Sequence, residues 1–76
     1  MKEKAHESIN EKLSALNKTH ITCNEGQWIK QQLINKYHIL LQHLEENEDV
    51  DMDKFCSIIK ATHKEVEELI CKWESN

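Results

Sequence analysis

Cysteine and histidine are the residue types of this chain whose side chains could act in catalysis or bind a metal ion. Cys56 or Cys71 could in principle form a dyad with His63, because a thiolate nucleophile needs an adjacent base. Both cysteines, however, are predicted to lie on apolar helix faces, where a thiol behaves as a small hydrophobic side chain. No oxyanion site or cofactor loop accompanies them, and 76 residues are too few for a deep pocket. We therefore predict a protein that is not an enzyme and that uses no cofactor.

Two histidine patterns could bind a metal ion. His20 and Cys23 form an H-x-x-C pair in a segment predicted to be a loop. Zinc needs four convergent ligands, which usually come as two close pairs. His38 and His43 are five residues apart, so a helix would not place both on one face. We predict surface histidines and no metal site.

An acidic segment, residues 45–53, holds six carboxylates and no basic residue. Its D-x-D-x-D run begins like an EF-hand calcium loop, which also needs glycine at the sixth position and glutamate at the twelfth. Lys54 and Lys60 stand at those two positions, so calcium binding is not expected. The segment is interpreted as a solvated turn between helices, or as a patch that binds a basic partner. The patch residues are Glu46, Glu48, Asp49 and Asp51.

The composition narrows the class of protein. The 10 basic residues are all lysines and face 14 acidic ones, giving a net charge of −4. An acidic surface disfavours nonspecific nucleic-acid binding, which depends on neutralising phosphates. The length predicts one small domain with a thin core, over residues 1–76. The three cysteines, without an apolar segment that could form a signal peptide or a membrane span, predict a cytoplasmic protein with reduced thiols.

Helical periodicity dominates the chain, and no long stretch alternates apolar and polar residues. Asp51 is a predicted N-cap, and Thr62 with Glu65 forms a predicted capping box that opens a last helix. Ser8 and Glu11 form a similar box, so residues 1–7 could fray. We predict an all-α fold of four helices, Lys2–Asn17, Gln27–Glu46, Met52–Lys60 and His63–Glu74.

Two stretches of the sequence, HILLQHLEENEDVDMDKF and KFCSIIKATHKEVEELI, carry a resemblance over about residues 35–74. The first resembles the first helix and lead-in of tri-helical and winged-helix regulators, and the second resembles a helix-turn-helix unit of the tri-helical superfamily. In the second stretch, small, apolar and capping residues fall at the packing positions of that unit. It implies a turn at Lys60–His63 and a recognition helix that enters DNA. Lys60 replaces the usual glycine of the turn, and the second helix exposes glutamates and lacks arginine. The matching residues are Cys56, Ile59, Thr62, Val66 and Leu69.

Three functions compete on these observations. The leading one is a small regulatory protein that binds another protein or a second copy of itself, with its last helix in a groove of the partner. The second is a DNA-binding regulator that would use lysines of its first two helices. The third is an acidic inhibitor that occupies a nucleic-acid-binding protein. The apolar contact residues of the leading hypothesis are Val66, Leu69, Ile70 and Trp73.

Overall fold

The computed structural model describes residues 2–74 and contains three helices, α1 (Lys2–Lys18), α2 (Asn24–Glu46) and α3 (Met52–Trp73). No strand occurs among these residues. The predicted all-α class is therefore confirmed, whereas the prediction of four helices is wrong. The third and fourth predicted helices form the single helix α3.

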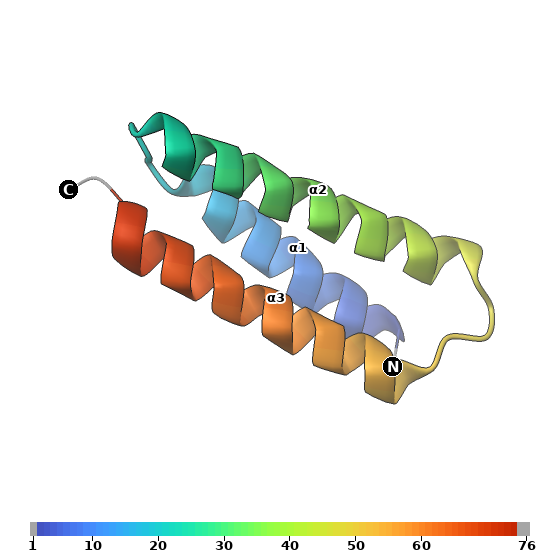
Figure 1. The fold of residues 1–76 in the computed structure, drawn as a ribbon. Coiled ribbons are helices and arrows are strands. Elements are labelled where there is room, and N and C mark those ends of the chain that lie inside the picture. The colour runs from blue at the N-terminus through green and yellow to red at the C-terminus, as the bar shows by residue number, and fades with distance from the viewer. Residues whose placement is uncertain (1, 75–76) are drawn as a thin grey trace.

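The three helices run up, down and up along one long axis (Figure 1). The α1–α2 loop closes one end of the molecule and the α2–α3 link closes the other. Each helix packs against both of the others, and the Cα atoms extend over 41 × 17 × 16 Å. The three helices therefore share one core, and each keeps one outer face.

The core forms because each helix carries one apolar stripe with steps of three or four residues. Such stripes let three nearly parallel helices interdigitate along their full length. Tyr37 is the largest side chain without solvent exposure, and it lies in the middle of α2. The buried apolar residues are Ala5, Ile9, Leu13, Leu16, Ile21, Leu33, Tyr37, Leu40, Leu44, Phe55, Ile59, Val66 and Leu69.

Helix α3 continues through Lys60–His63, where the sequence predicted a turn. Thr62 is fully buried and its hydroxyl donates to the carbonyl of Ile58 at 2.8 Å, a bond typical of threonine inside a helix. The Thr62 hydroxyl therefore makes its hydrogen bond within α3 instead of capping a new helix. The stripe also keeps its steps of four and three across this position, so one continuous helix turns all of it toward the core. The stripe consists of Phe55, Ile59, Thr62, Val66, Leu69 and Trp73.

The helix ends agree with the sequence at one of three predicted caps. Asp51 is the N-cap of α3, and its carboxylate accepts from the Lys54 amide at 3.3 Å. Helix α2 begins at Asn24, earlier than the predicted start at Gln27, and Cys23 holds the N-cap position. Residues 2–7 are helical, so Ser8 does not begin α1; residue 1, also part of the predicted frayed segment, lies outside the described residues.

Gly26 is buried where the start of α2 meets the preceding loop and the end of α3. A Cβ atom at this position would lie 2.6 Å from Ile21 Cγ2 and 3.2 Å from Trp73 Cβ. A contact of 2.6 Å is shorter than packed proteins tolerate, and one of 3.2 Å is tight, so something must shift if a side chain is added. The one glycine of the chain therefore serves a close approach, and its backbone has no positive φ.

Replacing Gly26 with alanine is expected to lower the free energy of unfolding by about 1–2 kcal/mol, because overpacking outweighs the helix propensity gained. Chemical denaturation measures this difference. In an Ile21→Ala background the same replacement should instead be neutral or stabilise by up to about 1 kcal/mol, because the clashing methyl group is gone. Equal destabilisation in both backgrounds would contradict the steric explanation.

Candidate functional site

The four apolar residues predicted to contact a partner do not form an accessible surface. Val66 and Leu69 are 0% and 3% exposed and belong to the core. Ile70 and Trp73 are half-buried and pack against that core. The predicted helix-in-groove contact is therefore wrong for Val66 and Leu69, because the stripe that looked free in sequence is covered by α1 and α2.

The acidic patch does form an exposed surface at the α2–α3 link. Glu46, Glu48, Asp49 and Asp51 are all exposed. Asp51 also caps α3, so its carboxylate already accepts a hydrogen bond from the Lys54 amide. Near the link, His6 Nε2 lies 3.2 Å from the Glu45 carboxylate.

The reactive side chains are dispersed. Cys56 and Cys71 are exposed on α3, which corrects their predicted place on apolar faces, and Cys23 is half-buried at the start of α2. Within residues 2–74, no three histidine, cysteine, aspartate or glutamate side chains come close enough to share a metal ion. None of the helices in this part of the chain has the length and apolarity needed to cross a membrane.

His63 instead joins the three helices through a polar contact that the sequence did not reveal. Its Nδ1 lies 2.6 Å from the Tyr37 hydroxyl on α2, and its Nε2 lies 3.0 Å from the Ser8 hydroxyl on α1. A neutral imidazole has one donor and one acceptor, so one hydroxyl donates to the ring while the other accepts from it. The hydrogen bonds from Ser8 through His63 to Tyr37 thus give partners to polar groups that would be costly to bury without them.

The surroundings keep this contact uncharged. Burial lowers the pKa of His63, and Lys12 lowers it further while Glu67 opposes the shift. Burial also raises the pKa of Tyr37, with added effects of Glu65 and Glu67. Both groups are therefore neutral near pH 7. We assign the contact a structural role, because it fixes the register of the three helices at the middle of the bundle.

Acidification is expected to destabilise the protein through His63. The pKa of His63 is lower in the folded chain than in the unfolded one, so protons bind the unfolded state first and favour it. The free energy of unfolding should be highest above about pH 7 and should fall as the pH drops through about 6.5. Denaturation at several pH values measures this, and His63→Gln should flatten the step while the exposed His38→Gln keeps it. An unchanged step in His63→Gln would contradict the assignment.

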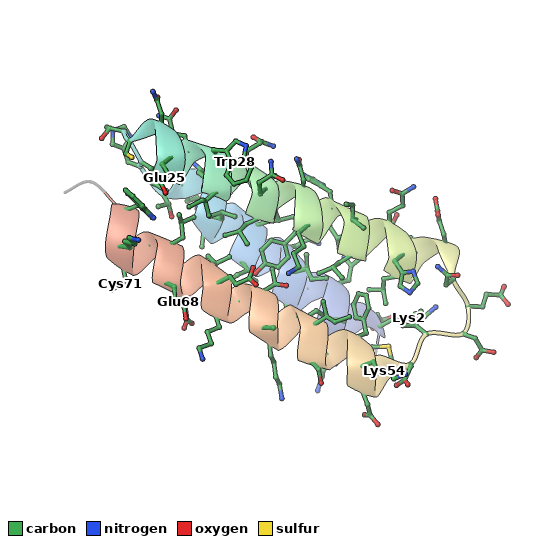
Figure 2. The ribbon with its side chains drawn as sticks, in the orientation of Figure 1. Lys2, Glu25, Trp28, Lys54, Glu68 and Cys71 are labelled. Carbon is green, nitrogen blue, oxygen red and sulfur yellow. The ribbon has the colours of Figure 1, made fainter. Side chains whose placement is uncertain are left out.

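The outer face of α2 is the surface that sequence reasoning missed. Trp28 is 64% exposed and Ile39 is 66% exposed. Figure 2 shows Trp28 in the first half of α2. None of the exposed residues between Gly26 and Leu44 is Lys, Arg, Asp or Glu, in a chain with 32% charged residues. We define the α2 outer face as Gln27, Trp28, Gln31, Gln32, Asn35, His38, Ile39, Gln42 and His43.

The two lysines of this helix are turned away from that face. Lys30 Nζ donates to the Thr19 carbonyl in the α1–α2 loop at 2.9 Å. Lys36 Nζ lies 3.6 Å from the Glu65 carboxylate on α3. Both side chains are half-buried along the sides of the bundle. Both lysines of α2 thus point toward a neighbouring element, which leaves the α2 outer face without a charged side chain.

A hollow with a volume of about 460 Å³ lies between α1 and α3. Ala5, Met52, Cys56 and Ile59 supply its apolar walls. Its polar members include Ser8 and His63, which already bind each other. Its remaining lining residues, Lys4, Asp53 and Lys60, are exposed to solvent, so the described residues that line the hollow supply no further buried polar group that could orient a ligand.

The outer faces of the other two helices are charged. Helix α1 exposes Glu3, Lys4, Glu7 and Glu11, and α3 exposes lysines and glutamates along its length. Figure 2 shows Glu68 and Cys71 on α3. Comparison of the chain with protein-family models, with curated proteins and with solved structures found no significant match.

Proposed function

We propose that this small protein is a non-enzymatic regulator that binds another protein, and that the α2 outer face is its binding surface. The observation that carries the proposal is an uncharged helix face with exposed Trp28 and Ile39 on an otherwise charged molecule. The cores of protein interfaces are depleted in charge and enriched in aromatic residues. Tryptophan is also among the residues that contribute most to binding.

Protein is a better match for this surface than nucleic acid. The α2 outer face offers no cation to a phosphate, and binding to DNA depends on such contacts. The helix-turn-helix resemblance gives DNA binding no further support, because α3 has no turn at Lys60–His63. We propose that the protein acts in the cytoplasm, where its three free cysteines would stay reduced.

A photo-crosslinking amino acid at Gln31 tests this proposal in an extract of the source cells. Gln31 is exposed in the α2 outer face, so the probe reports contact without replacing Trp28 or Ile39. We expect protein adducts from Gln31, and their loss in a Trp28→Ala variant. The same probe at the exposed Glu68 of α3 is the matched control. Equal adducts from both positions, or none from Gln31, would contradict the proposal.

A second candidate function is an acidic inhibitor that binds a basic protein. It is favoured by the exposed carboxylates gathered at the α2–α3 link. Replacing Glu46, Glu48 and Asp49 by amides tests it, and Asp51→Asn can be added because asparagine also caps helices well. Binding to a basic partner should weaken several-fold in this variant and in high salt. Full binding by the variant at low salt would exclude this function.

A further inference from the structure

We infer that the occupant of the α2 outer face is a second copy of this chain, packed with its α2 antiparallel to the first. The inference rests on the proposed function, since it names the partner of the same surface. Its basis is a line of five exposed residues along α2, with steps of four and three residues. This spacing is that of helices that pack side by side over several turns. The line consists of Trp28, Gln32, Asn35, Ile39 and Gln42.

The residues of this line can pair with the same line of a second copy that runs in the opposite direction. Trp28 and Ile39 lie equally far from the midpoint between Leu33 and Ile34, and so do Gln32 and Asn35. A two-fold axis at that midpoint therefore places Trp28 of each copy opposite Ile39 of the other. The same axis places Gln32 opposite Asn35. A two-fold interface requires such self-complementarity, because one patch must serve both sides.

The chemistry of the two pairs supports this arrangement. Tryptophan and isoleucine bury apolar area together, and each is about two-thirds exposed in the single chain, at 64% and 66%. Asn35 Oδ1 accepts from Gln31 of its own helix at 3.0 Å, and its amide nitrogen can donate to the Gln32 side chain across the axis. Polar residues in such a line also fix the register and direction of packed helices.

Charge selects the antiparallel direction over the parallel one. The exposed acids of α2 lie at its two ends, at Glu25, Glu45 and Glu46. A parallel pair would place each of these opposite its own copy, whereas the antiparallel pair places Glu25 opposite the uncharged Gln42. Antiparallel helices also oppose their dipoles. The molecule carries a net charge of −4, and the α2 outer face is where two copies can approach with least repulsion.

The contact covers one helix pair over about 17 Å between Trp28 and Ile39, at roughly 1.5 Å for each residue. An interface of this size falls below about 1,200 Å², among the weak and transient complexes. The dimer should therefore dissociate on dilution. This reversibility would let the concentration of the protein control how much of the α2 outer face is covered.

Sedimentation equilibrium of the purified full chain, from about 10 μM to about 1 mM, tests the inference in the range of weak complexes. We expect the mass to rise from 9.0 kDa toward twice that value. Ile39→Glu should remain a monomer, because it brings a carboxylate to the apolar pair. The matched control is Ile58→Glu, on the 44% exposed isoleucine of α3, which should still dimerise. Circular dichroism confirms that both variants keep their helices.

Disulfide trapping then tests the direction of the pair, in a chain whose native cysteines are replaced. A mixture of Glu25→Cys and Gln42→Cys proteins should form the mixed disulfide, while each protein alone forms little. Self-coupling of each variant would indicate a parallel pair and overturn the inference, as would a monomer at every concentration or a dimer that survives Ile39→Glu. If the purified protein stays monomeric while Gln31 still captures another protein, only the inference fails. If neither occurs, the proposed function fails too.

Discussion

Replacing Leu69 with alanine should lower the free energy of unfolding by about 3 kcal/mol, within the range for leucine-to-alanine changes in packed cores. Leu69 is 3% exposed and lies in the stripe of α3 that faces both other helices. The chain is small and its stability is expected to be only about 5 kcal/mol or slightly more. This one change should therefore remove a large part of the stability, and thermal or urea denaturation measures it.

Cys71→Ala is the matched control, because Cys71 is exposed two residues further along the same helix. Its effect should stay within about 0.5 kcal/mol, as for most surface changes. The comparison also separates a core residue from a partner contact. If Leu69→Ala left stability unchanged but abolished protein binding, Leu69 would be the exposed contact that the sequence suggested, and the packing of α3 would be wrong.

Replacing Ala61 with proline should cost about 3 kcal/mol or more, because proline removes a backbone hydrogen bond and clashes with the carbonyl of Ser57. Ala61 lies inside the continuous helix α3, and its side chain is exposed, so the effect comes from the backbone. Helix content by circular dichroism and urea denaturation measure the loss.

Ala61→Gly distinguishes this effect from a local side-chain change. In a helix interior, glycine costs about 1 kcal/mol relative to alanine, so the two variants should be graded. In a helix-turn-helix unit, position 61 would precede the cap of the second helix and would tolerate both residues. Near-native stability of Ala61→Pro would therefore mean that α3 is two helices after all.

The sequence predicted the helices well where periodicity and caps agree. The end of α2 at Glu46 and the Asp51 cap of α3 were both predicted, because acidic residues stop one helix and start the next. The break at Thr62 was wrong because threonine before Glu65 fits a capping box equally well whether or not the helix continues. The uninterrupted spacing of Ile59, Thr62, Val66 and Leu69 was the signal that favours one helix.

The candidate site was harder to predict, because it depends on which apolar residues the core leaves out. Helix α2 has more apolar residues than one stripe can hold, and only the packing of three helices shows that Trp28 and Ile39 are the surplus. The contact of Ser8, His63 and Tyr37 joins residues up to 55 positions apart, and no local pattern reveals it. Glutamine, asparagine and histidine recur between Trp28 and His43, but Lys30 and Lys36 lie among them, so only the structure shows that the outer face of α2 is uncharged.

Mapping amide and indole nuclear magnetic resonance shifts against protein concentration tests the central claim most directly. As the concentration of the labelled chain rises, shifts should move at the Trp28 indole and along Gln32, Asn35 and Ile39. The outer face of α3 near Glu68 and the acidic link near Asp49 should stay unchanged. Shifts confined to the link or to α3, or spectra that do not change with concentration, would contradict the claim that α2 binds a second copy.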